Sequence, residues 1–141
     1  MIQGVVDGIC RKLNVTFGDG HKVHTEAVKQ GLKGPCFLVL LVSPSSVPVV
    51  GGRCLRGHLF DIHYFPGSNE PRAECHAVQD ELYLALEYVV ADGGIVRGTG
   101  MRGEFIDGAL HFFVSYDFFA MGNAQTEAMK LLEHLQTTMK G

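Results

Sequence analysis

The sequence has little charge, and none of that charge forms a basic run. Charged residues make up 19% of the 141 residues, whereas soluble domains usually contain about 25%. The net charge is -3 at pH 7, while modules that bind nucleic acid concentrate Lys and Arg on one face to neutralise phosphates. We therefore expect no direct recognition of a nucleic-acid sequence. We also expect part of this weakly charged surface to be covered.

Long hydrophobic segments are missing as well. The longest, residues 35–42, is far shorter than the roughly 20 residues that cross a bilayer, and the N-terminus lacks the basic and then apolar layout of a signal peptide. We expect a cytoplasmic protein with no membrane partner. The four cysteines lack CxxC spacing, so they are expected to be reduced thiols rather than a disulfide framework.

The seven histidines and four cysteines form no short metal motif. They are densest at Cys54, His58, His63, Cys75 and His76. On a regular strand Cys54 and His58 share one face while His63 lies on the other, so three of these side chains do not readily converge on one ion. We predict no metal ligand and no cofactor, and ordinary core or surface roles for these residues.

Catalytic motifs are also lacking. There is no GxSxG, and the sequence links no cysteine to a histidine and an orienting carboxylate. Asp61 and His63 share a strand face, which favours a structural hydrogen bond over a catalytic pair. Residues 98–103 spell GxGxxG, but dinucleotide binding needs that turn to open a helix, and here the chain continues as a strand. We predict no catalytic residue, and glycines that serve a bulge or a close backbone approach.

Hydrophobic spacing predicts one α+β domain over residues 1–141, with a mainly antiparallel sheet flanked by helices in the order α-β-β-β-α-β-β-α. The first helix is expected to bury Ile2, Val6, Ile9, Leu13 and Phe17. The second is expected to bury Cys75, Val78, Leu82, Leu86 and Val89 and to end at residues 92–94. A third is predicted over about residues 123–139.

The strands are predicted at residues 22–28, 36–42, 53–65, 95–106 and 109–119. The second of these is apolar at every position, which is typical of a strand covered on both sides in the middle of a sheet. Residues 43–52, with two prolines and a glycine pair, are expected to form a loop or irregular hairpin. The pair Asp107-Gly108 predicts a tight hairpin turn between the last two strands.

The last predicted strand has two faces of different character. One carries Leu110, Phe112, Val114, Tyr116 and Phe118, and is a core face. The other carries His111, Phe113, Ser115, Asp117 and Phe119, so two phenylalanines lie where water is expected. Coverage by the C-terminal helix, contact with another copy of the chain, or a strong strand twist could each bury them. Because large apolar patches are uncommon on monomers, we favour subunit contact. We predict an oligomer interface at His111, Phe113, Ser115 and Phe119.

Five segments together resemble a known family. They are TEAVKQGLKGPCFLV (25–39), HYFP (63–66), ECHAVQDELYLALEYV (74–89), IVRGTGM (95–101) and DGALHFFVSYDFF (107–119). In this order they are similar to small tail terminator proteins from prophages of Gram-positive bacteria. The resemblance spans about the first 119 residues, and the order of strands and helices is similar to that of tail terminator and tail-completion proteins of long-tailed phages.

The resemblance implies a non-enzymatic part of a virion tail or of a phage-like particle, assembled in the bacterial cytoplasm. It implies a homo-oligomeric ring, most simply a hexamer, that docks on the last ring of tail tube protein, stops tube growth and offers its other side to the head-tail connector protein. Ring closure means that one surface meets a different one on the neighbouring copy. A head-tail connector or adaptor is the alternative structural role, and a small metal- or ligand-binding enzyme using His58 and His63 is the alternative from another class.

Overall fold

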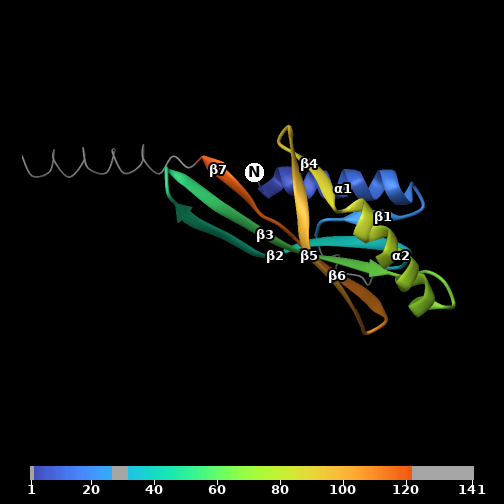
Figure 1. The fold of residues 1–141 in the computed structure, drawn as a ribbon. Helices are drawn as coiled ribbons and strands as arrows, with labels where there is room; N and C mark the ends of the chain where they lie inside the picture. Colours follow the sequence, from blue (N-terminus) through green and yellow to red (C-terminus); the bar gives the residue numbers. More distant parts are fainter. Residues whose placement is uncertain (1, 27–31, 122–141) are drawn as a thin grey trace, which may run out of the picture.

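The computed structural model describes residues 2–26 and 32–121. In chain order these residues form α1 (Ile2–Phe17), β1 (Lys22–His24), β2 (Cys36–Val49), β3 (Arg53–Phe65), α2 (Pro71–Ala85), β4 (Tyr88–Ala91), β5 (Gly94–Ile106), β6 (Ala109–Tyr116) and β7 (Phe118–Met121) (Figure 1). The sheet has the order β1-β2-β3-β6-β5-β4, and β7 pairs with β3. Among the strands of the described residues, only β1 and β2 pair in parallel. The predicted α+β class with a mainly antiparallel sheet is confirmed.

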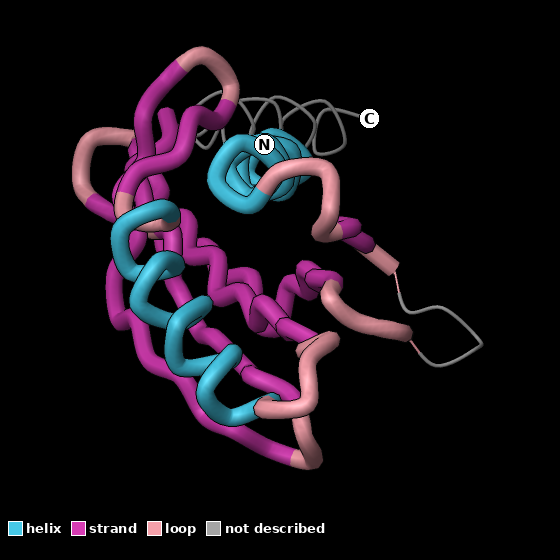
Figure 2. Tube along the Cα trace, turned by 90° about the vertical axis from the view of Figure 1, so that its right-hand side faces the viewer, coloured by secondary structure: helices cyan, strands magenta, loops and turns pink. Residues whose placement is uncertain are grey.

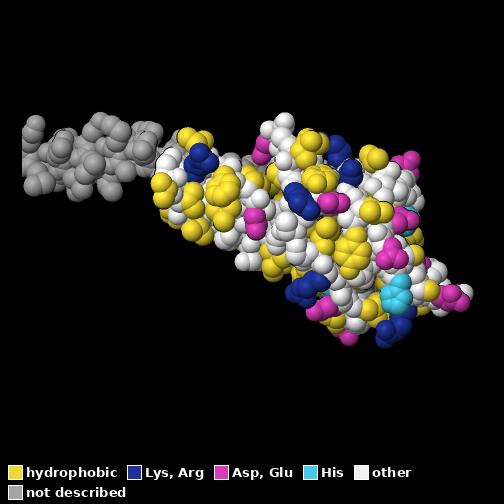
Figure 3. All heavy atoms as spheres, in the orientation of Figure 1, with side chains coloured by type: hydrophobic (Ala, Val, Ile, Leu, Met, Phe, Trp, Pro, Cys, Tyr) yellow, Lys and Arg dark blue, Asp and Glu magenta, His cyan; other side chains and the backbone are white. Residues whose placement is uncertain are grey.

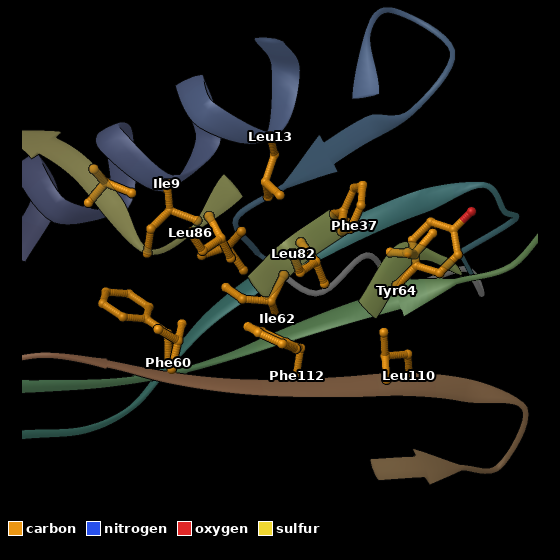
Figure 4. Packing of buried hydrophobic residues seen from close by; sticks show 14 of the residues in the cluster. Ile9, Leu13, Phe37, Phe60, Ile62, Tyr64, Leu82, Leu86, Leu110 and Phe112 are labelled. Carbon is orange, nitrogen blue, oxygen red and sulfur yellow. The ribbon is translucent and has the colours of Figure 1, made fainter. Parts of the chain in front are cut away.

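The helices α1 and α2 contribute to one core on one face of the sheet. Figure 4 shows Ile9 and Leu13 of α1 and Leu82 of α2 directed at side chains that rise from the strands below, and Figure 2 shows α1 inside the curve that the strands make. The strands contribute alternate residues, as a pleated sheet requires. The fully buried strand residues are Phe37, Phe60, Ile62, Tyr64, Leu110, Phe112, Val114 and Tyr116. The predicted core face is therefore confirmed for Leu110, Phe112, Val114 and Tyr116. Phe118, the fifth predicted member, is only partly buried and packs against the same core.

The second helix is shorter than predicted. It ends at Ala85, and Leu86 closes it through a backbone hydrogen bond from its N–H to the carbonyl of Leu82. The chain then forms β4, which pairs with β5 through a tight turn at Asp92-Gly93, both with positive φ. All five residues of the predicted stripe are buried. The last of them, Val89, is a residue of the strand β4 and not of the helix. The prediction that the helix continues to residues 92–94 is wrong.

Residues 43–52 are also misassigned by the sequence pattern. They mostly continue β2, which runs to Val49 and pairs with β3 along its whole length, with a bulge between Leu41 and Ser43. The first four residues of β2 are buried, but residues 42–48 are exposed. Coverage on both sides is therefore limited to one end of β2. The expected strand 22–28 is described only as β1, because residues 27–31 lie outside the described part.

The first helix turns a slightly different face to the core from the predicted one. Val5, Gly8, Ile9 and Leu13 are buried, whereas Ile2 is exposed and Val6 and Phe17 are partly buried. The predicted third helix at about residues 123–139 lies outside the described residues.

The glycine-rich segment 98–103 lies inside β5, as predicted. The pairing of β5 with β6 shifts register between Thr99 and Arg102, and Gly100 has a φ of 61°, a conformation that side chains rarely adopt. A Cβ at Gly98 would overlap the carbonyl of Leu86. The predicted bulge and close approach are therefore confirmed. The Asp107-Gly108 turn is confirmed too, with φ of 51° and 78°.

Gly8 allows α1 to lie directly on the backbone of β4, because a Cβ there would overlap the carbonyl oxygen of Val90. Alanine favours a helix by about 1 kcal/mol over glycine, but backbone cannot rotate away as a side chain can, and overpacking costs about 1–3 kcal/mol. We expect Gly8→Ala to lower the free energy of unfolding, measured by urea titration. The control Asn14→Ala, at an exposed site on α1, should leave it within about 0.5 kcal/mol. A Gly8→Ala variant more stable than the parent would contradict this close packing.

Glu74 fixes the loop that leads into α2. Its carboxylate accepts hydrogen bonds from the Tyr64 hydroxyl, from Gly67 N at 3.0 Å and from Ser68 N at 2.9 Å. Burial acts to raise the pKa of Glu74, but the hydrogen bonds from Ser68, Tyr64 and Gly67 outweigh it and hold the pKa below the ordinary value. A lowered carboxyl pKa stabilises the fold above the pKa of the unfolded chain, and this stabilisation is lost as the pH falls through the folded-state pKa.

We therefore expect Glu74→Gln to destabilise the chain by about 1 kcal/mol at pH 7, a value reduced by the solvent exposure of the loop. The difference from the parent should begin to shrink as the pH falls below the ordinary glutamate pKa of about 4.3. It should continue to shrink as the pH passes through the lower folded-state pKa, because the parent carboxylate is then protonated. Urea unfolding at half-unit steps from pH 7 to pH 3 measures this. Asp80→Asn, which removes an exposed carboxylate from the same helix, is the matched control. A difference independent of pH would exclude the carboxylate charge as its cause.

Candidate assembly surface

Three strands extend beyond the helices and form an arm, which we define as residues 43–49 of β2, residues 53–57 of β3, and β7 (Figure 1). On one face of the arm, pairing places Val47 beside Leu55 and Leu55 beside Phe119. The next row includes Met121, opposite Arg53. Val47, Phe119 and Met121 are 53%, 62% and 78% exposed. We call Val47, Leu55, Phe119 and Met121 the arm patch.

The β2 side of the arm is exposed on both of its faces, since every residue from 42 to 48 is exposed. The β1 pairing stops at Leu38, so the outer edge of β2 has no strand beside it among the described residues. Pro44 and Pro48 lie in this segment. Proline lacks the N–H that would pair with an added strand, and it commonly protects sheet edges. This arrangement favours contacts through side chains over the addition of another strand.

Hydrophobic side chains gather on the arm with few charged ones among them (Figure 3). A second exposed apolar group lies on the body of the molecule, where α1 meets the β4–β5 pair. It contains Val15, Tyr88, Val90 and Ile95, of which Val15 and Ile95 are 81% and 74% exposed. Val15 and Val90 line a cavity of about 200 Å³ together with Gly8, Arg11 and Lys12. We call Val15, Tyr88, Val90 and Ile95 the body patch.

The four residues of the predicted interface lie on β6 and β7, two strands that pair with β3 one after the other. Ser115 is opposite Leu59 on β3, and Phe119 is opposite Leu55, so β6 and β7 pair with β3 in the same register. The interruption is at Asp117, whose carboxylate accepts a hydrogen bond from His58 N at 3.3 Å. The predicted strand 109–119 therefore continues to Met121 after a break at one residue.

The four residues of the predicted interface differ in how much of each side chain is exposed to solvent. His111, Phe113 and Ser115 are half-buried on the body of the sheet, whereas Phe119 is exposed on the arm. The guanidinium of Arg102 lies 4.3 Å from the centre of the Phe113 ring and covers part of it. Twist does not bury Phe119. Coverage by the C-terminal helix concerns residues outside the described part, and subunit contact at these four residues stays a prediction.

Asp61 and His63 are hydrogen-bonded as predicted, with 2.8 Å between Oδ2 and Nε2. Sequence reasoning missed that His111 joins them, with Nδ1 3.2 Å from the same oxygen. The missing information was the register, since His111 and His63 are direct partners on β6 and β3. The expected separation of the other candidates holds: Cys54, His58 and Cys75 are buried and do not belong to this group.

A cavity of about 560 Å³ lies between the end of α1 and the start of α2. Its lining includes Phe17, His21, Tyr64, Glu74 and Glu81. Burial raises the pKa of Tyr64, and its hydrogen bond to Glu74 raises it further. Tyr64 is therefore a poor proton donor to a ligand at neutral pH, and Glu74 already serves the loop before α2. These contacts indicate a structural rather than a catalytic role.

Within residues 2–26 and 32–121, no helix combines the length and the apolar character needed to cross a membrane. A comparison with curated proteins found no match. A family model described as phage tail terminator protein matches residues 4–129. Among the described residues, this match covers α2, all of α1 except its first two residues, and every strand, including those of the arm. It supports a structural role in a phage tail. The chain belongs to the phage tail terminator protein family.

Proposed function

We propose that this protein forms a closed ring of six copies that caps the phage tail tube, stops its growth and joins it to the head-tail connector protein. The family supports the structural tail role. In this proposal the chain has no catalytic activity, assembles in the bacterial cytoplasm and ends in the virion tail. Its partners are further copies of itself, the tail tube protein and the connector protein.

The arm is the observation that carries the proposal. The arm part of β2 is exposed on both faces and lies beside an apolar patch. Its own chain therefore buries few of its side chains. Exposed apolar patches of this kind mark contact sites more often than free surface. Burying the side chains of the arm patch against protein would contribute about 25 cal/mol for each Å² of apolar area removed from water. Other copies of the chain are present wherever the chain is made. We therefore propose that another copy covers the arm patch.

A ring requires two different surfaces on each copy, because a heterologous contact closes only if one patch meets another through a constant rotation. The arm patch and the body patch meet this requirement, since they lie on different elements and both expose aliphatic or aromatic side chains. A stable contact buries about 800 Å² on each partner. We propose that the arm patch of one copy covers the body patch of the next.

The test measures assembly and capping separately. Sedimentation of the full chain from micromolar to near-millimolar concentration should show a monomer that converts to one closed species, seen as rings by negative-stain microscopy. Added to isolated tail tubes, the protein should bind one end and prevent further growth when tube protein is supplied. A monomer at every concentration contradicts the ring. Rings that bind connector rings but never tubes would instead assign the adaptor role.

A further inference from the structure

The face of the sheet that is turned away from the helices carries a group of three potential metal ligands. His63 on β3 and His111 on β6 are direct cross-strand partners, and their ring centres are 4.1 Å apart. Asp61 lies two residues before His63 and therefore projects from the same face. The nearest ligand atoms of the three side chains all lie within 4.8 Å of one another. A sheet thus holds these ligands without help from a loop.

The carboxylate of Asp61 has an unused oxygen. Asp61 is 9% exposed, and both imidazoles contact its Oδ2. Its Oδ1 is buried and has no hydrogen-bond partner among the described residues. A buried polar atom without a partner costs free energy, and such atoms often indicate a missing ion or water. A cation beside this carboxylate would remove that cost.

We propose that Asp61, His63 and His111 bind one first-row transition-metal ion, with Zn²⁺ as the reference ion. Imidazole nitrogen and carboxylate oxygen are ordinary Zn²⁺ ligands at about 2.0–2.2 Å, whereas Mg²⁺ and Ca²⁺ prefer sites made of oxygen alone. Ligand atoms of a tetrahedral Zn²⁺ are about 3.3 Å apart at those bond lengths. The observed separations from Oδ2 are 2.8 Å and 3.2 Å, and all three ligand atoms lie within 4.8 Å of one another, so rotation of the side chains must bring them to this spacing.

The surroundings of Asp61, His63 and His111 allow an ion to enter from solvent and to be retained. The side chains of His63 and His111 keep 18% and 21% of their surface exposed, which leaves a path to the ligand atoms. Phe65 lies beside His63, with 6.1 Å between ring centres. The nearby cation, Arg102, is paired with Glu104 at 2.8 Å, and this pairing offsets its repulsion of an ion. Three protein ligands leave a further position for water or for a side chain from a partner.

The site makes a prediction that does not depend on ring formation. Isothermal titration of metal-free, untagged full-length monomer with Zn²⁺ should give one ion per chain. The melting temperature should rise with Zn²⁺ concentration, because an ion that binds only the folded state stabilises it. His111→Gln and, separately, Asp61→Asn should weaken Zn²⁺ binding by more than about 100-fold, since loss of even an outer partner of a ligand costs 10- to 100-fold.

Two control variants separate this site from other zinc-binding groups. His76→Gln removes an exposed histidine of α2, and Cys10→Ser removes a partly exposed thiol; both should bind Zn²⁺ as the parent does. Three results would overturn the proposal. They are no binding by the parent, unchanged binding by His111→Gln and Asp61→Asn, or one ion for every two chains, which would indicate an ion held between copies.

Discussion

A chain with Phe119→Asp and Met121→Asp is expected to remain monomeric at concentrations at which the proposed ring of the parent should form. Both side chains belong to the arm patch, and both are more than half exposed in the single chain. Carboxylates there would have to lose their water when the neighbouring copy covers them, and burying an unpaired charge costs several kcal/mol. Because a ring repeats the contact at every interface, the cost recurs at each one. Sedimentation velocity measures the result.

The matched control is Leu84→Asp with Ile106→Asp. These exposed residues lie on α2 and at the end of β5, outside both patches, and the charge change is the same. This variant should assemble like the parent. The melting temperature of each variant, measured on the monomer, should lie within a few degrees of that of the parent monomer. If the control loses assembly as well, or if the arm variant still forms rings, the arm patch is not the contact.

Mixing separates a heterologous contact from a symmetric one. Val15→Asp with Val90→Asp should also prevent assembly, because it alters the body patch. When this variant is mixed with the arm variant, one intact arm patch meets one intact body patch, so a heterodimer should form and grow no further. If the arm patches of two copies met each other instead, this heterodimer could not form, because the arm variant would have no intact contact surface.

Local chemistry made some elements predictable from the sequence. The Asp107-Gly108 turn was predicted because two adjacent residues supply the positive φ that the tight hairpin needs. The core face of β6 followed from alternation, which depends on the strand alone. The buried stripe at Cys75, Val78 and Leu82 followed from helical spacing in the same way.

The errors have a common cause in contacts distant along the chain. Leu86 and Val89 fit the helical stripe, but the Tyr116 hydroxyl donates to the Leu86 carbonyl at 2.6 Å, and Gly98 N donates to the Glu87 carbonyl at 2.7 Å. These contacts coincide with the change from α2 to β4. The β2 part of the arm was predicted as a loop or irregular hairpin because its serines and prolines are typical of turns, and only pairing with β3 makes it a strand.

The same limit applies to the sites. The spacing of Asp61 and His63 predicted their hydrogen bond, because both are on one strand. The position of His111 beside them depends on the register of β3 against β6, which no local pattern encodes. Sequence reasoning placed His111 in an interface with Phe113, and the register adds a carboxylate and a second imidazole to its surroundings. The metal proposal therefore became possible only with the fold.

Phe112 and Phe113 provide the most direct test of which face of β6 is the core. Phe112 is 0% exposed and packs edge-on against Tyr83, with ring centres 5.4 Å apart. Phe112→Ala is expected to lower the free energy of unfolding by about 3–5 kcal/mol, a large share of the about 5–15 kcal/mol of a typical domain. The variant should unfold at much lower urea concentration and lose assembly as a consequence.

Phe113→Ala is the matched control one residue along the strand. Its half-buried ring contacts the Arg102 guanidinium, and a cation–π contact at an exposed site contributes about 0.5–1 kcal/mol. Phe113→Ala should therefore cost the monomer much less stability than Phe112→Ala. If the outer face of β6 takes part in the ring, Phe113→Ala should weaken assembly while the monomer stays folded. Equal losses of monomer stability in the two variants would mean that both faces of β6 are core, and that the exposed surface needed for a ring lies on the arm alone.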